Sequence, residues 1–231
     1  PINAVYGFAS ILLRMIRELK PDYIVAARDI SGRTLRHESF EQYKAHRPET
    51  PKDLEIQFSK TDDLLDAFNI PIYRHEGYEA DDVIGTIAHI LEKETDIEII
   101  VVTGDQDILQ LIRPGLFVYA MKKGVSDFTL YDEAVVLERY GFSPKQMVDY
   151  KGLKGDASDN IPGVKGIGEK TAKELIKQYG TVEQIYTALD YNGDAFSKSV
   201  RERLQSGKDI AFLSKELATI RTNVPISFER A

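Results

Sequence analysis

The chain has 231 residues, a length that allows one large domain or a domain with a smaller appendage. It contains no cysteine, which excludes disulfides and thiolate metal sites and fits a reducing, cytoplasmic compartment. No apolar run approaches the ~18 residues of a membrane span, so we expect no membrane association. The formal net charge of −7 argues, taken alone, against a polyanionic partner.

Helices and strands alternate in the first part of the sequence. Apolar residues recur at helical spacing over residues 1–20, which predicts an amphipathic helix with Asn3 as its cap. We expect the natural chain to begin upstream of this helix. The apolar run 22–28 predicts a buried strand. The polar residues 30–52 predict a long loop or mobile segment with a helical piece around 38–45. Further elements are predicted as helices over 53–69, 80–93 and 106–112, and as strands over 70–74, 98–105 and 117–124.

The pattern becomes almost wholly helical from about residue 133, and it ends in an extended tail over 221–231. Alternation followed by helices predicts an α/β fold class, in which a mostly parallel sheet is flanked by helices and an all-helical part follows. We therefore expect an α/β core over residues 1–145 and a helical subdomain over 146–231.

Eight carboxylates form four short clusters, each at the predicted end of a strand or start of a helix. They are Asp29; Glu79, Asp81 and Asp82; Asp105 and Asp107; and Asp156 and Asp159. Without them the rest of the chain carries a formal charge of +1. Acids also favour first turns of helices, and Asp is common in turns, so each cluster alone has a structural explanation. In a compact fold such a density of charge calls for cations, and all-oxygen sites suit Mg²⁺ or Mn²⁺. The combination predicts a two-metal centre for phosphodiester chemistry.

A glycine-rich stretch, IPGVKGIGEK at 161–170, directly follows the last acidic cluster. Gly163, Gly166 and Gly168 permit a tight backbone and a close approach by a ligand. Because a helix is predicted from Glu169, free backbone N–H groups would face a phosphate. We interpret the stretch as a helix–hairpin–helix element that contacts duplex backbone without reading sequence. The predicted contact residues are Gly163, Lys165, Gly166, Gly168, Lys170 and Thr171.

A second basic stretch lies in the segment 30–52, which we call the arch. It carries Arg33, Arg36, Lys44 and Arg47, with Tyr43 as an aromatic residue. Tyr43 is predicted to stack on a base, and the cations are predicted to contact phosphates. A solvated charged loop is the alternative interpretation of this segment alone.

Four motifs occur in this order and spacing: RHES…YKAHRP, GYEADDVIGT, VVTGDQDILQL and GLKGDASDNIPGVKGIGEKTA. Together they resemble the 5′-nuclease family of flap endonucleases, and most closely the 5′–3′ exonuclease domains at the N-termini of bacterial DNA polymerases. The resemblance implies a PIN-like nuclease core and hydrolysis of DNA at 5′ flaps, junctions and RNA primers. It further implies two Mg²⁺ or Mn²⁺ ions held by the eight acids, a K⁺ ion at the hairpin, and Lys44 and Arg47 as catalytic cations.

The resemblance also implies a setting for the protein. We expect a monomer, or one domain of a larger polymerase chain, in the bacterial cytoplasm at the nucleoid. Three features depart from the family pattern. Its first strand, which carries a further metal-binding Asp, is absent from this sequence; Arg28 replaces an apolar residue; and Gln106 replaces a common Lys. Strand alternation turns Arg28 away from Asp29, so Arg28 requires its own partner or a route to solvent.

Two other functions remain open at this point. The missing strand and Arg28 are consistent with a junction-binding module that no longer cuts DNA. A PIN-type RNase would share acidic clusters on an α/β sheet, although it has little use for the arch and the hairpin.

Overall fold

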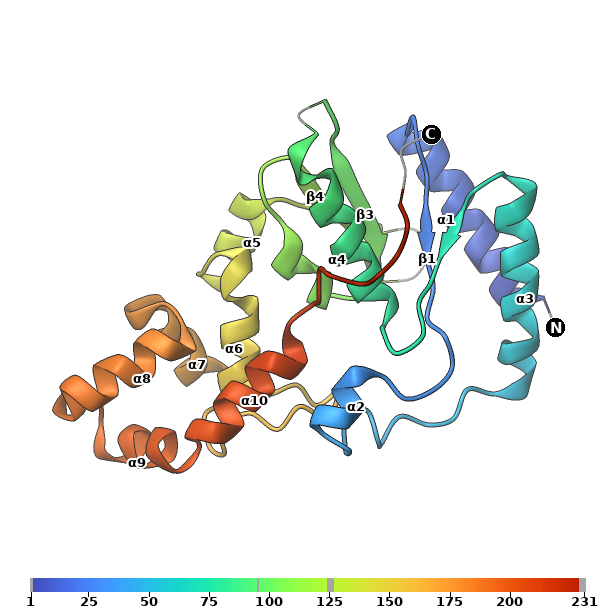
Figure 1. Ribbon diagram of the computed structural model, residues 1–231. Coiled ribbons are helices and arrows are strands. Elements are labelled where there is room, and N and C mark those ends of the chain that lie inside the picture. The colour runs from blue at the N-terminus through green and yellow to red at the C-terminus, as the bar shows by residue number, and fades with distance from the viewer. Residues whose placement is uncertain (1, 95, 124–126, 229–231) are drawn as a thin grey trace.

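The computed structural model describes residues 2–94, 96–123 and 127–228 (Figure 1). Pro1 of the predicted first helix, Gly124 of the predicted strand and turn, and the last three residues of the predicted tail lie outside these ranges. The α-helices are α1 (Asn3–Leu19), α2 (Leu35–Ser39), α3 (Lys52–Ala67), α4 (Ala80–Ile90), α5 (Glu133–Tyr140), α6 (Met147–Lys154), α7 (Glu169–Tyr179), α8 (Val182–Tyr191), α9 (Lys198–Ser206) and α10 (Lys208–Ala218). The strands are β1 (Ala26–Ala27), β2 (Ile72–Tyr73), β3 (Ile99–Thr103), β4 (Leu116–Lys123) and β5 (Asp127–Tyr131), and the 3-10 helices are η1 (Leu91–Lys93), η2 (Asp107–Leu111), η3 (Pro144–Gln146) and η4 (Gly193–Ala195).

The predicted α/β class is confirmed, but the strands form two small sheets. β1 pairs with β2 in parallel, with Ala26 opposite Ile72. β3 pairs with β4 in parallel over five residue pairs, and β4 pairs with β5 in an antiparallel hairpin. The expected mostly parallel sheet therefore ends in an antiparallel strand that the sequence analysis did not foresee. The predicted helix at 106–112 is a 3-10 helix, η2, and the strand expected over 22–28 pairs only at 26–27.

Helix α4 lies between the two sheets and buries residues toward both (Figure 1). Ala88 packs into the cluster of β3 and β4, which includes Val101 and Val118. Val83 and Ile87 pack on the other side against Ala27 and Tyr73. Because α4 is buried on both sides, its sequence is mostly apolar. The same packing places the first turn of α4 next to the ends of β1 and β3.

Helix α1 covers the edge of the molecule beside α3 (Figure 1). Its Leu12 is buried with Leu65 and Ile70, as an amphipathic stripe requires. The predicted cap was wrong, because Asn3 is already helical and no side chain of the preceding residue caps the helix. Gln57 of α3 satisfies the helix start instead, since its Oε1 accepts a hydrogen bond from Ala4 N at 2.8 Å.

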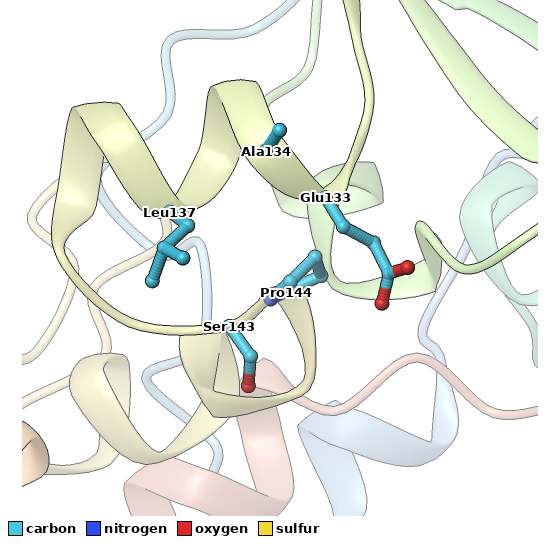
Figure 2. A pocket seen from close by; sticks show the side chains of 5 residues that line it. All are labelled: Glu133, Ala134, Leu137, Ser143 and Pro144. Atoms are coloured by element: carbon cyan, nitrogen blue, oxygen red, sulfur yellow. The ribbon is translucent and has the colours of Figure 1, made fainter.

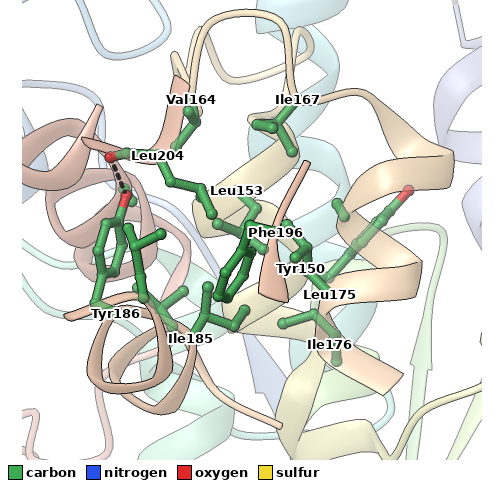
Figure 3. Packing of buried hydrophobic residues seen from close by; sticks show 14 of the residues in the cluster. Tyr150, Leu153, Val164, Ile167, Leu175, Ile176, Ile185, Tyr186, Phe196 and Leu204 are labelled. Atoms are coloured by element: carbon green, nitrogen blue, oxygen red, sulfur yellow. Dashed lines mark hydrogen bonds between the residues drawn. The ribbon is translucent and has the colours of Figure 1, made fainter. Parts of the chain in front are cut away.

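The helical part has its own apolar core, built from α6 to α10 and the hairpin (Figure 3). Val164 and Ile167 of the hairpin point into it beside Leu153 and Leu204. Tyr186 is buried there, and its hydroxyl donates to Leu204 O at 3.0 Å. This core holds the glycine-rich stretch in one conformation against its neighbours.

The chain beyond α10 returns to the α/β core and crosses α4 (Figure 1). Val224 is buried against Val83 and Ile87, and its N–H donates to Thr86 Oγ1 at 3.0 Å. A Cβ atom on Gly85 would lie 2.6 Å from Ile220 Cγ2, so the absent side chain makes this crossing possible.

The molecule has a shallow hollow outside these cores. Its volume is about 370 Å³, and it is lined by Glu133, Ala134 and Leu137 of α5 and by Ser143 and Pro144 (Figure 2). It shares no lining residue with the acidic pocket described below. In the described ranges no helix is long and apolar enough to cross a bilayer.

Candidate active site

Five of the eight predicted acids line one small pocket between the α/β core and the helical part. They are Glu79, Asp81, Asp105, Asp107 and Asp159. Arg36, Tyr43 and Lys44 line the same pocket, as do Leu217, Ala218 and Ile220. The volume is about 20 Å³, which accommodates about one water-sized particle. We call this the acidic pocket.

The local fold explains how distant acids meet there. Asp105 and Asp107 follow β3, and Glu79 and Asp81 lie at the first turn of α4. Asp29 follows β1, and its Oδ1 accepts a hydrogen bond from Ala80 N at 2.7 Å at the start of α4. Strand ends and a helix N-terminus therefore converge, which places carboxylates where free backbone N–H groups favour negative charge.

Asp81 is surrounded by other acids and has a raised pKa. Burial, together with the negative charges of Asp105, Asp107, Glu79 and Asp29, raises the pKa of Asp81 to about 7. Burial also raises the pKa of Asp107, to about 6, although Lys151 opposes the shift. A site with this excess of negative charge and with carboxylate oxygens as its donors fits a hard divalent cation.

Lys151 of α6 joins two acidic clusters and was missed by the sequence analysis. Its Nζ pairs with Asp107 and donates to Asp156 Oδ2 at 2.6 Å, and only 10% of its side chain is exposed. Burial acts to raise the pKa of Asp156, but hydrogen bonds from Lys151 and Ser158 outweigh it and hold the pKa at about 2. Lys151 stands just before GLKGD, five residues from Asp156, and its position in the sequence gave no signal of this role.

Asp82 has a different environment from its neighbour Asp81. It is 1% exposed, and both of its oxygens accept hydrogen bonds from Arg36 at 2.7 Å. The N–H groups of Glu79 and Arg221 donate to it as well, at 3.1 and 2.8 Å. Burial opposes ionisation, yet these bonds keep the pKa of Asp82 below its usual value. In this structure its oxygens bind Arg36 and backbone, and they are unavailable to a metal ion.

Arg36 is therefore internal, where the sequence analysis expected it to contact DNA. Its Nε and Nη2 donate to Leu217 O and Thr219 O, both at 2.9 Å. The guanidinium thus connects α2, the first turn of α4 and the end of α10. Arg33 is exposed, with one hydrogen bond to His37 O at 3.4 Å.

The arch is docked on the acidic pocket, and outside one short helix it consists of turns and irregular backbone, as its composition predicted. Its helical piece is α2, which begins three residues before the predicted start and is followed by turns. Tyr43 is 2% exposed, and its hydroxyl donates to Glu79 Oε2 at 3.2 Å and Asp159 Oδ2 at 3.1 Å. In this conformation Tyr43 does not present its ring to a base.

The two predicted catalytic cations reach the pocket from the arch. Lys44 Nζ donates to Glu79 Oε1 at 2.8 Å and lies 3.6 Å from Asp159 Oδ2. Arg47 pairs with Asp159 through Nη2. As the side chains stand, no three acids within the described ranges are arranged to enclose one metal ion. The cations of the arch and Lys151 occupy several of their oxygens.

The predicted hairpin lies beside the pocket at the surface of the helical part. Gly163 and Gly166 have φ values of +62° and +84°, which side chains rarely adopt. Gly168 caps α7 in extended conformation. Lys165 and Lys170 are exposed, and Thr171 is half-buried. Lys165 and Lys170 are therefore on the surface, where a duplex could reach them.

Arg28 and Gln106, which depart from the family pattern, each interact with residues nearby in the structure. Arg28 forms an ion pair with Asp62 of α3 and donates to Phe58 O at 3.1 Å, as its orientation away from Asp29 requires. Gln106 Oε1 accepts a hydrogen bond from Tyr140 at 2.9 Å. Gln106 therefore connects the loop after β3 to α5.

The chain matches two known protein-family descriptions, which together cover residues 1–231. A family described as "5′-3′ exonuclease, N-terminal resolvase-like domain" matches residues 1–141, and "5′-3′ exonuclease, C-terminal SAM fold" matches residues 142–231. The chain belongs to the 5′–3′ exonuclease family. The predicted resemblance is thereby confirmed.

The relatives are longer proteins, and this chain matches one part of each. DNA polymerase I of Caldicellulosiruptor bescii is 46% identical over 98% of this chain, and that of Bacillus subtilis is 46% identical over 97%. The chain spans about a quarter of the length of these relatives, 26% and 25%.

Solved structures share the exonuclease fold. The zinc-bound T5 5′-exonuclease has a TM-score of 0.77 at 22% identity, and the match covers 94% of this chain and 81% of that protein. The T5 D15 flap endonuclease, in a pseudo-enzyme-product complex with DNA and metal ions, has a TM-score of 0.76 at 22% identity over 96% of this chain and 82% of its own.

Proposed function

We propose that the chain is a structure-specific 5′ nuclease that hydrolyses DNA phosphodiesters at 5′ flaps or junctions. Such a 5′–3′ exonuclease removes flaps and RNA primers during replication and repair. The observation that carries this proposal is the acidic pocket, where Asp81, Asp105 and Asp107 meet beside the cations of the arch. Relatives named DNA polymerase I and a neighbour bound to DNA and metal ions support it.

Two Mg²⁺ or Mn²⁺ ions fit the donor set, which consists of oxygens with excess negative charge. Asp29, Glu79, Asp81, Asp105 and Asp107 would hold one side of the site, and Asp156 and Asp159 the other. Asp82 remains in the proposed set only if Arg36 releases it. When bound, the ions activate the attacking water and stabilise charge on the scissile phosphate.

The chain's own residues would orient the substrate. Lys44 and Arg47 lie at the pocket and would turn from Glu79 and Asp159 toward phosphate oxygens. The hairpin would bind duplex backbone through its N–H groups and through Lys165 and Lys170, with a K⁺ ion on its carbonyls. Tyr43 would hold Glu79 and Asp159 in place through its hydroxyl.

We further propose that the protein acts in the bacterial cytoplasm, at the nucleoid. It would act as a monomer or as one domain of a larger polymerase chain. The relatives' lengths and names support the second arrangement.

Cleavage of a 5′-flap duplex tests the function. In Mg²⁺ the chain should release the flap, and Asp105→Ala should lower the cleavage rate by about 10²-fold or more, because it removes a carboxylate from the charge-stabilising site. Single-turnover cleavage of a labelled flap measures this loss. Flap affinity of Asp105→Ala should stay within about threefold of wild type.

Asp63→Ala is the matched control, since Asp63 is an exposed carboxylate of α3 outside the pocket. It should cleave at the wild-type rate. Flap binding without turnover in Mg²⁺ or Mn²⁺ would contradict the nuclease proposal and select the alternative, a junction-binding module. The pairing of the acids with Lys44, Arg47 and Lys151 is the observation that keeps this alternative open.

A further inference from the structure

The hairpin, residues 162–168, is held from three sides by the helical part. Val164 N donates to Leu153 O at 2.8 Å, and Gly163 N donates to the buried Ser214 Oγ at 3.0 Å. On the third side Arg203 Nη1 donates to Gly166 O at 2.8 Å. The first two contacts are buried, whereas the third lies at the surface beside Lys165.

The side chain of Arg203, which belongs to another element, α9, lies close to the hairpin backbone. A Cβ atom built on Gly166 would be 2.9 Å from Arg203 Nε and 3.2 Å from its Cζ. The guanidinium is therefore fixed over the one hairpin glycine that is exposed and has a positive φ. A side chain ordered in this way loses little further entropy when it binds a ligand.

The charge of Arg203 has no carboxylate partner in the described ranges. One of its five N–H donors is used on Gly166 O, and no ion pair to Asp or Glu forms within them. Arg201, two residues earlier on the same helix, instead pairs with Asp194 at 2.6 Å. The acid nearest in sequence to the hairpin, Glu169, is paired with Lys173 at 2.6 Å. Exposed, ordered and unneutralised N–H donors match a phosphate oxygen.

We propose that Arg203 is a phosphate-binding residue of the duplex interface, acting together with the hairpin from outside its sequence. It fixes the Gly166 carbonyl with one N–H group and presents the others to the DNA backbone. Lys165 and Lys170 flank the same surface and add positive charge. This inference rests on the proposed function, because it names a contact to the DNA that the nuclease would cut.

Equilibrium binding to a plain blunt duplex tests the inference without any cleavage. Affinity is measured by fluorescence anisotropy in EDTA over a range of KCl concentrations, for wild type, Arg203→Gln, Arg203→Lys and Arg201→Gln. Arg203→Gln should weaken binding about 3- to 10-fold and reduce the slope of log K against log[KCl] by about 0.9, the value of one lost phosphate contact. Arg203→Lys should retain the slope, and Arg201→Gln should match wild type.

The salt slope separates phosphate binding from a purely structural role. If Arg203 only holds the hairpin, Arg203→Gln lowers affinity and the melting temperature while the salt slope stays unchanged, and the inference is overturned. Unchanged affinity overturns it as well. Wild-type protein that does not bind the duplex contradicts the duplex part of the proposed function and this inference with it, whereas binding without an Arg203 effect contradicts only the inference.

Discussion

Asp81 and Asp82 show how adjacent residues in one helical turn acquire different roles. They are about 100° apart around α4, so Asp82 faces Arg36 and the returning tail while Asp81 faces the acids after β3. The sequence predicted the same role for both. Only Asp81 has the unneutralised environment expected of a metal-binding carboxylate.

The raised pKa values of Asp81 and Asp107 predict a pH dependence of stability. Both lie above the ordinary 3.8, at about 7 and about 6, so the unfolded chain releases these protons first. Their contribution to stability is therefore complete below about pH 4 and lost as the pH rises through 6 to 7. In EDTA we expect the free energy of unfolding to fall by roughly 1–3 kcal/mol between pH 5 and pH 8. Urea denaturation at a series of pH values measures it.

Asp81→Asn and Asp82→Asn separate the two roles. Asp81→Asn should remove most of the pH slope and raise stability at pH 8. Asp82→Asn should leave the slope in place and cost about 3–5 kcal/mol, because it leaves the buried Arg36 with only Glu79, at 3.5 Å, as a counter-charge. Equal effects of the two substitutions would contradict the assignment.

The crossing of the tail over α4 depends on a single glycine in the helix. A Cβ on Gly85 would meet Ile220 Cγ2 at 2.6 Å and Arg221 O at 3.1 Å. The first neighbour is a side chain in a packed core and the second is backbone. Neither can move far without displacing the residues that hold Asp82 and Arg36.

Gly85→Ala therefore has two opposed effects. Alanine improves helix propensity by about 1 kcal/mol, but overpacking a core costs about 1–3 kcal/mol. We expect a net loss of stability, measured as a lower urea midpoint. Gly7→Ala in α1 is the matched control, since no described atom outside the local backbone of α1 lies within 4 Å of its Cβ position, and it should raise stability by up to ~1 kcal/mol. If Gly85→Ala instead raised the urea midpoint, the tail would be able to shift without a loss of packing, and the prediction would be wrong.

At the scale of the whole molecule, the two family segments meet at the acidic pocket. Asp107 belongs to the first segment, and Asp156, Asp159 and Lys151 to the second. Lys151 pairs with acids from both, so one buried cation offsets repulsion across the junction. The arch and the tail add further contacts between the segments through Arg47 and Arg36.

Replacing Lys151 by Met should remove this compensation. In EDTA, Lys151→Met should lower the melting temperature, because Asp107 and Asp156 then face each other without a cation. Millimolar Mg²⁺ should raise the melting temperature of Lys151→Met more than that of wild type, since a bound divalent ion replaces the lost charge.

Lys154→Met is the control on the same helix. Lys154 is exposed, its Nζ lies over the ring of Tyr150, and it forms no ion pair with Asp107 or Asp156. Its substitution should leave the Mg²⁺-induced shift at the wild-type size. Thermal unfolding of the three proteins with and without Mg²⁺ gives the comparison, and an identical shift for Lys151→Met would contradict a bridging role.

The sequence alone determined the fold class and the family, and it predicted a set of candidate acids, because these follow from local patterns: strand-ending Asp residues, acids in a first helical turn and a glycine-rich turn before a helix. Tertiary structure decided which acids are free. Asp82 is bound by Arg36, more than forty residues away, and Lys151 reaches Asp107 across the family-segment junction. The arch is docked because Tyr43 finds partners in Glu79 and Asp159. Arg203 contacts Gly166 only through packing of α9 on the hairpin. Charge compensation and packing join residues far apart in the chain, and periodicity and spacing carry no information about such pairs.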